Sequence, residues 1–358
     1  MQGLSVLFRS IKWNQRVSET YLRACCRSIP ILLVALAMTA SAGSSAVPGP
    51  GATDATHAGV SAPIVLPIEY SDRHIFVTFE DERQHPLTFL LDTGFENSAL
   101  TRAAAGNRYI MWLGETKLKG YGGKAPERWF GKSTVVLRTG QVNVFSGTVL
   151  VLDRDFIQSQ IEHPADGILG WDVFSQWCST LDVGARRLTL RPRSECSTPP
   201  DGGREIQHDW MKQGLLVPAA ITFAPGRKAR TMLRLDTGCD TALVLNPQFR
   251  EIAGIGRPGV AARPIDSWGV NGTSTADRVT VSSIELDGGA IRIPGSAQPT
   301  VVIQREGAVA RSHLWNTKEA KVSRDGLLGM ELLERFTWTF DPEGKKVYIA
   351  SSAGKTPE

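Results

Sequence analysis

Residues 86–100 read PLTFLLDTGFENSAL, and residues 230–245 read RTMLRLDTGCDTALVL. Each stretch runs from an apolar segment into Asp-Thr-Gly and then into a second apolar segment. The two aspartates, Asp92 and Asp236, are 144 positions apart (236 − 92 = 144). Self-similarity at a fixed distance is typical of a duplicated structural unit. The chain is therefore predicted to contain two copies of one unit, each carrying one Asp-Thr-Gly.

A second pair of motifs follows the first. Residues 166–170 read DGILG and residues 325–329 read DGLLG, at an offset of 159 (325 − 166 = 159). This offset continues through residues 171–190 and 330–349, so the second copy has a net insertion of 15 residues (159 − 144 = 15) between its two motifs. Two motifs in the same order in each half are far more specific than a single Asp-Thr-Gly.

The local patterns are those of strands. Segments such as 76–79 and 187–190 cluster β-forming residues between turn residues, and the chain has 35 Gly and 20 Pro, which favours β structure. Segments 180–182 and 187–190 predict a hairpin, which 339–341 and 346–349 repeat. Short helices are expected at 171–177 and 330–336. Upstream, we expect Val77 and Phe79 to correspond to Ile221 and Phe223 at the 144-residue offset.

The N-terminal segment is typical of a targeting signal. Five basic residues and one acidic residue within 1–42 account for the whole net charge of +4. The apolar run 29–38 and the small residues Ala40-Ser41-Ala42 complete the pattern, with cleavage expected after Ala42. We therefore expect an exported protein, periplasmic or secreted, with an N-terminal membrane anchor as the alternative. The remaining chain is neutral and offers no basic surface for nucleic acid.

Composition and motifs together predict the domain organisation. The expected segments are a signal peptide or anchor (1–42), a flexible leader (43–62), an N-terminal lobe (63–196), a linker (197–207), a C-terminal lobe (208–350) and a tail (351–358).

Three cysteines lie outside the signal. Cys178 and Cys196 either form a disulfide in an oxidising compartment or pack in a core. Cys239 is interpreted as a small buried hydrophobe rather than a redox switch. The cysteine and histidine spacing does not indicate a metal site.

Paired carboxylates suit general acid–base work on water. Two carboxyl groups held close together cannot both ionise easily, so they share a proton, and one acts as base while the other donates a hydrogen bond. Each aspartate here follows an apolar strand, and the glycine after it permits a tight turn that presents the carboxylate. A duplicated unit can bring two such loops face to face.

In these motifs, residues 64–350 resemble the pepsin and retropepsin superfamily of aspartic peptidases. An acidic residue stands two positions after each Gly, Glu96 in one half and Asp240 in the other, and in this the chain is similar to bacterial retropepsin-like proteins with two fused lobes. The resemblance implies an all-β fold of two homologous barrel-like lobes, with few short helices and the active site in the cleft between them. It implies an endopeptidase that cleaves a peptide or protein substrate without a cofactor or metal. Because both halves lie in one chain, a monomer could be complete.

The resemblance also assigns the site. Asp92 and Asp236 would be catalytic, Thr93, Gly94, Thr237 and Gly238 would support the catalytic loops, and the Ile-Leu-Gly and Leu-Leu-Gly motifs would lie behind them. Glycine-flanked aromatic residues predict mobile flaps over the substrate. The expected substrate-binding and flap residues are Tyr121, Gly122, Gly123, Trp268, Gly269, Glu96 and Asp240.

Phe95 departs from the pattern, because the residue after Asp-Thr-Gly is usually small in that superfamily. Either Phe95 packs into the first lobe and the aspartate keeps its role, or the first half is distorted. The second interpretation leads to the alternative function, a catalytically inactive two-lobed protein that binds peptides or glycans. Neither Leu-Gly is followed by the Arg common in retropepsins, so an Arg partner for Glu96 or Asp240 is not expected there.

Overall fold

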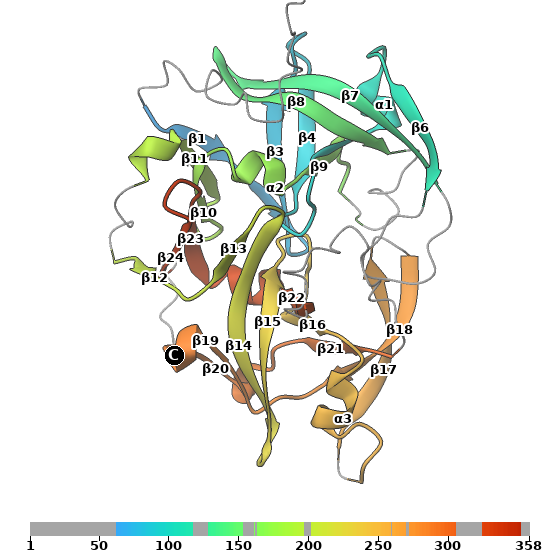
Figure 1. The fold of residues 1–358 in the computed structure, drawn as a ribbon, viewed down its shortest axis with the longest axis vertical. Coiled ribbons are helices and arrows are strands. Elements are labelled where there is room, and N and C mark those ends of the chain that lie inside the picture. The colour runs from blue at the N-terminus through green and yellow to red at the C-terminus, as the bar shows by residue number, and fades with distance from the viewer. Residues whose placement is uncertain are drawn as a thin grey trace, which may run out of the picture. The chain divides into compact units, whose positions relative to one another are not determined.

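The computed structural model describes residues 62–116, 128–152, 161, 163–196, 202–258, 260–269, 272–305 and 324–351. These residues form the expected all-β fold of two lobes, built from three sheets and a few short helices (Figure 1). The predicted signal at 1–42 lies outside them. Within the described ranges, every helix is too short to span a membrane.

Eight strands make the sheet of the first lobe. In spatial order they are β2 (Glu69–Ser71), β3 (His74–Glu80), β4 (Pro86–Leu91), β9 (Gly167–Leu169), β5 (Ala99–Thr101), β8 (Val142–Leu152), β7 (Arg128–Thr139) and β6 (Met111–Thr116). Most of the apolar residues in β3 and β4 are buried, whereas Thr78, which lies between two buried residues of β3, is exposed. The Ile-Leu strand β9 runs parallel to β4. This pairing carries the second motif beside the strand that leads into Asp92.

Ten strands make the sheet of the second lobe. Nine lie in the order β17 (Ala262–Gly269), β18 (Gly272–Val279), β21 (Val301–Gln304), β16 (Leu243–Leu245), β22 (Arg324–Leu328), β15 (Arg227–Leu235), β14 (Gly214–Ala224), β19 (Ser283–Leu286) and β20 (Ile291–Pro294), and β13 (Asp209–Met211) pairs with β14. Strand β22 runs parallel to β15, as β9 does to β4. The two Asp-Thr-Gly motifs therefore leave equivalent strands.

A third sheet is shared by both halves. Its order is β1 (Ile64–Pro67), β11 (Arg187–Arg191), β10 (Cys178–Asp182), β23 (Phe336–Asp341), β24 (Lys346–Ser351) and β12 (Arg204–Glu205). The two predicted hairpins are β10–β11 and β23–β24, and they meet where β10 pairs with β23 in antiparallel orientation. The joint between the repeats is thus a continuous sheet.

The strand register corrects one prediction about the repeat. Val77 pairs with Phe89, and the residue 144 positions after Phe89 is Leu233, which pairs with Val217. Val217, rather than Ile221, is therefore the counterpart of Val77. The predicted correspondence was wrong because the β14–β15 hairpin holds four more residues than β3–β4, at its far end. By the same shift, Ala219 replaces Phe223 as the counterpart of Phe79.

The helices that follow each Leu-Gly are shorter than expected. Helix α2 spans Trp171–Phe174 and α4 spans Met330–Leu333, so both end three residues before the predicted boundary. In the described part of the chain, the remaining helices are α1 (Arg102–Ala105), α3 (Phe249–Ala253) and the 3₁₀ turns η2 (Arg193–Glu195), η3 (Asp287–Gly289) and η4 (Gly295–Ala297).

Aromatic side chains from both halves meet under the shared sheet. The ring of Trp171 lies 5.2 Å from that of Trp210 and 6.1 Å from that of Phe340, and Phe174 lies 5.9 Å from Phe340. Trp171, Phe174 and Phe340 are each almost fully buried. Tilted and edge-on aromatic contacts of this kind add to the hydrophobic stabilisation of the joint.

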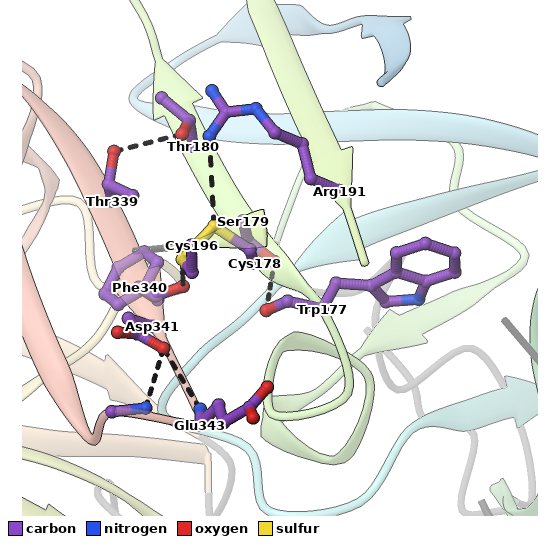
Figure 2. The surroundings of a disulfide bond; sticks show 11 residues. Trp177, Cys178, Ser179, Thr180, Arg191, Cys196, Thr339, Phe340, Asp341 and Glu343 are labelled. Carbon is purple, nitrogen blue, oxygen red and sulfur yellow. Dashed lines mark hydrogen bonds between the residues drawn. A yellow bond between two sulfur atoms is a disulfide. The ribbon is translucent and has the colours of Figure 1, made fainter. Parts of the chain in front are cut away.

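Cys178 and Cys196 form a disulfide, which confirms the first of the two predicted alternatives, a disulfide or two cysteines packed in a core (Figure 2). The bond ties β10 to the chain after η2, and Cys196 Sγ lies 3.5 Å from the carbonyl oxygen of Phe340 in β23. A disulfide is typical of a protein that folds in an oxidising compartment.

Candidate active site

The strands behind the two aspartates hold them in the same way. The backbone N–H of Asp92 donates to the carbonyl of Leu169, and that of Asp236 donates to the carbonyl of Leu328, each over 3.0 Å. These acceptors are the central residues of the Ile-Leu-Gly and Leu-Leu-Gly motifs. The second motif of each half therefore fixes the position at which the Asp-Thr-Gly turn begins.

The glycines of these motifs are required by close packing. A Cβ atom on Gly170 would lie 2.8 Å from the carbonyl oxygen of Phe95, and one on Gly329 would lie 2.6 Å from that of Cys239. The residues after these glycines donate backbone hydrogen bonds to the same two carbonyls, over 2.8 Å and 2.7 Å. Only glycine lets the supporting strand approach the Asp-Thr-Gly loop this closely.

Thr93 and Thr237 interlock the two loops. The N–H of Thr93 donates to the hydroxyl of Thr237 (3.0 Å), and the N–H of Thr237 donates to the hydroxyl of Thr93 (3.1 Å). Each hydroxyl in turn donates to the opposite strand, Thr93 to the carbonyl of Leu235 (3.1 Å) and Thr237 to that of Leu91 (2.8 Å). Both side chains are almost fully buried. Four reciprocal bonds thus lock the two aspartates in a fixed relative position.

The carboxyl groups of Asp92 and Asp236 meet at this junction. A Cβ atom on Gly238 would lie 2.5 Å from the carboxyl carbon of Asp92, and one on Gly94 would overlap the carboxyl of Asp236. Each glycine therefore makes room for the aspartate of the other lobe. The N–H of Gly238 also donates to Asp236 Oδ1 (2.9 Å), and the N–H of Gly94 donates to Asp92.

Burial raises the pKa of Asp92 well above its ordinary value, and the charge of Asp236 and a hydrogen bond to it act in the same direction. Burial also raises the pKa of Asp236, against the positive charge of Arg234 and the hydrogen bond from Asp92. Both shifts favour retention of a proton between the two carboxyl groups, which titrate as a unit. Asp92 Oδ1 is buried and has no hydrogen-bond partner among the described residues.

The two loops differ in what supports them from below. In the first lobe, Asp172 accepts hydrogen bonds from the N–H and the hydroxyl of Ser98 (2.9 and 2.7 Å). In the second lobe the equivalent positions are Ala242 and Glu331, and Glu331 instead forms an ion pair with Arg73 of the first lobe (3.0 Å). The comparison of the two halves missed Arg73, because this residue lies in the turn after β2, outside both motifs.

Among the described residues, neither Glu96 nor Asp240 forms a hydrogen bond with the carboxyl group of Asp92 or Asp236. Glu96 offers its backbone carbonyl to the N–H of Asp172 (3.2 Å), and Asp240 offers its carbonyl to Arg73 (3.4 Å) while its side chain is exposed. The arginine that contacts Asp240 is therefore Arg73 from the β2–β3 turn, and it contacts the backbone carbonyl rather than the carboxylate.

Phe95 and Cys239 occupy equivalent positions after Asp-Thr-Gly. Phe95 is partly buried and packs on an apolar cluster of the first lobe, which includes Phe76 and Leu90. Burial, with the nearby charge of Asp236, raises the pKa of the Cys239 thiol, which contacts the hydroxyl of Thr241 (3.3 Å). The thiol therefore stays protonated near neutral pH.

The flap predictions divide. Tyr121, Gly122 and Gly123 lie outside the described residues. Trp268 and Gly269 lie at the end of β17, where they pair with Thr273 and Gly272 of β18 at the tip of a hairpin. Their role in a flap stays a prediction.

Two further groups near the aspartate pair escaped the motif analysis. The positive charges of Arg234 and of His74 both lower the pKa of Asp236. Arg234 could have been found in the sequence, because it stands where the first repeat has Leu90. His74 lies at the start of β3 and could not, since only the fold brings that hairpin to the other lobe.

No protein-family model matches the chain, and no curated protein matches it in sequence. Among solved structures, the chain is similar to the crystal structure of aspartic proteinase from Irpex lacteus, with a TM-score of 0.53 and 14% identity. The match covers 83% of this chain and 100% of that chain. The protein therefore has the two-lobed, all-β fold of a pepsin-like aspartic proteinase.

Proposed function

We propose that this protein is an aspartic endopeptidase that hydrolyses peptide bonds with a water molecule activated by Asp92 and Asp236. The observation that carries the proposal is the placement of the two carboxyl groups side by side at the junction of the interlocked loops. The similarity to an aspartic proteinase supports the same activity.

The roles are proposed from the surroundings of the pair, because Arg234 and His74 favour the ionised form of Asp236. Ionised Asp236 accepts a proton from the water as its oxygen attacks the peptide carbonyl carbon, and protonated Asp92 gives its proton to the carbonyl oxygen. The resulting diol collapses as Asp236 gives its proton to the peptide nitrogen, Asp92 takes a proton from one diol hydroxyl and the carbon–nitrogen bond breaks, which releases a carboxylic acid and an amine and restores both carboxyl groups. Asp92 Oδ1 has no hydrogen-bond partner among the described residues and is suited to accept a hydrogen bond during this reaction.

The interlocked loops support the mechanism through preorganisation. Because Thr93 and Thr237 fix the two strands to each other, the carboxyl groups need no rearrangement before the reaction. We also propose Trp268 and Gly269 as part of a flap over the substrate, because they lie at a hairpin tip of the second lobe. Glu96 and Asp240 are proposed to border the substrate site, since each lies two residues after a catalytic-loop glycine.

The disulfide and the N-terminal pattern lead us to propose an exported protein. The similarity to bacterial retropepsin-like proteins stays a prediction from Glu96, Asp240 and the compact halves.

The test is cleavage of a mixed peptide library by the purified protein between pH 3 and 7, read by mass spectrometry. Asp92→Asn and Asp236→Asn are compared with the wild type, together with a statine-type transition-state mimic. We expect cleavage that both substitutions abolish and the mimic inhibits. Activity that survives in either variant would exclude the mechanism, and a folded wild type that binds the mimic without cleaving any peptide would support the alternative, a non-catalytic binding protein.

A further inference from the structure

The two repeats differ in charge at the position two residues before each aspartate. This residue is Leu90 in the first lobe and Arg234 in the second. Because alternate residues of a strand point to the same face, Leu90 shares a face with Asp92, and Arg234 shares a face with Asp236. One side of the aspartate pair therefore carries an aliphatic side chain and the other a guanidinium.

The surroundings of Leu90 are apolar. Leu90 is 7% exposed and belongs to a compact cluster of buried side chains, against which Phe95 packs. The members of this cluster are Phe76, Leu90, Ala99, Leu152, Ala165 and Ile168. On the first-lobe side, the strand face that carries the aspartate is thus backed by apolar side chains.

In the second lobe, Arg234 occupies the position that Leu90 has in that cluster. Its neighbours across the sheet are Leu216 and Leu327, the counterparts of Phe76 and Ile168. Its Nη2 donates to the carbonyl of Gln213 (2.6 Å), which fixes the guanidinium beside the β13–β14 turn.

Gly214 provides the space for this arrangement. A Cβ atom there would lie 3.0 Å from Arg234 Nη2 and 3.1 Å from Nε, and Gly214 has a φ of 150°. The guanidinium is therefore built into the fold rather than extended into solvent, although Arg234 remains partly exposed. Its positive charge lowers the pKa of both Asp92 and Asp236, in keeping with a position beside the pair.

We propose that Arg234 is a specificity-determining residue that binds an acidic side chain of the substrate on the second-lobe side of the scissile bond, while the first-lobe side accepts an apolar side chain. A planar guanidinium binds a carboxylate through two parallel hydrogen bonds, and it does so best when it is held in one orientation. This inference rests on the proposed binding of a peptide at the aspartate pair.

The test uses two pairs of statine-type peptide mimics. The members of one pair differ only by Glu or Gln directly after the statine unit, and those of the other pair only by Glu or Gln directly before it. Dissociation constants are measured by calorimetry at one pH for the wild type, Arg234→Leu and Arg234→Lys. Arg230→Leu, an exposed arginine on the same strand β15, is the matched control.

For the wild type, we expect the Glu mimic of one pair to bind about tenfold more tightly than its Gln partner. Arg234→Leu should abolish this difference, Arg234→Lys should keep part of it, and Arg230→Leu should keep all of it. If Arg234→Leu does not fold, as judged by circular dichroism, Arg234→Gln takes its place.

Three outcomes overturn the proposal: equal affinities for Glu and Gln in both pairs, an Arg234 substitution that weakens Glu and Gln mimics equally, or no binding of any mimic. Equal weakening would assign Arg234 to positioning the loop or adjusting the aspartate pair. Library cleavage separates the two proposals. A Glu preference without cleavage leaves the role of Arg234 standing and removes the peptidase activity, whereas cleavage without a Glu preference removes only the role of Arg234.

Discussion

The hydroxyl groups of Thr180 and Thr339 lie 3.0 Å apart and share a hydrogen bond in the middle of the sheet that joins the lobes (Figure 2). The two residues are 159 positions apart, which is the offset of the second repeat motif, so each pairs with its own counterpart. Thr93 and Thr237 do the same at the aspartate pair, at the offset of 144. Both threonine pairs therefore join corresponding positions of the two halves of the chain.

The first prediction concerns the interlocked loops. Thr237→Val keeps the shape of the side chain but leaves the buried N–H of Thr93 and the carbonyl of Leu91 without partners. We expect a loss of about 2–4 kcal/mol in the free energy of unfolding, because buried unpaired groups add their desolvation penalty to the lost bonds. Urea unfolding measures it. Thr78→Val, which removes an exposed threonine pair with Thr88, is the control and should change stability by less than about 0.5 kcal/mol.

The second prediction concerns pH. A carboxyl whose pKa is raised by folding binds its proton more tightly in the folded protein, so its ionisation destabilises the fold. This destabilisation is absent below the ordinary carboxyl pKa of about 4 and grows as pH rises toward the folded-state value.

Asp92→Asn should therefore be more stable than the wild type at pH 7, by about 1–3 kcal/mol, with the difference shrinking toward pH 4. Unfolding by urea across that range measures it, and Asp72→Asn in the exposed β2–β3 turn is the control. A constant difference at all pH values would contradict the shared proton.

The third prediction concerns the disulfide, whose cysteines are 18 residues apart. Replacing both Cys178 and Cys196 by Ala should lower the free energy of unfolding by about 3 kcal/mol, as expected for a loop of this length. Thermal unfolding with and without dithiothreitol checks this. The reductant should destabilise the wild type and leave the double variant unchanged, and equal effects on both would show that the bond does not form.

The fourth prediction concerns Phe95. If Phe95 distorted the first lobe, Phe95→Ser would raise the cleavage rate. Because its ring packs on the cluster around Phe76 and Leu90, we expect instead a protein less stable by about 1–3 kcal/mol with no gain in kcat. Phe95→Leu, which keeps much of the apolar contact, should lose less. A faster Phe95→Ser enzyme would support the distorted first half.

Much of this arrangement could be predicted from the sequence. The paired Asp-Thr-Gly and Asp-Gly-x-Leu-Gly motifs predicted two similar halves, and local strand patterns predicted the β class and both hairpins of the shared sheet, which the structure contains. The two threonines were assigned, through the family resemblance, to the support of the aspartate loops, and the structure adds the hydrogen bonds between them. The alignment of Val77 with Ile221 failed, since residues added inside a hairpin shift the register without leaving a local signal.

The amino-acid sequence by itself determined which residues recur: two aspartates, two threonines and the glycines that allow close approach. Only the tertiary structure decided what surrounds them, including the choice of a disulfide over a buried thiol pair, the packing of Phe95, and the approach of Arg73 and His74 from the opposite lobe. The physical reason is that folding makes these contacts: Arg73 reaches Glu331, 258 positions away, and even Cys178 and Cys196, 18 positions apart, are joined only by the packing of their strands. Their geometry depends on how the lobes meet rather than on the residues beside each motif.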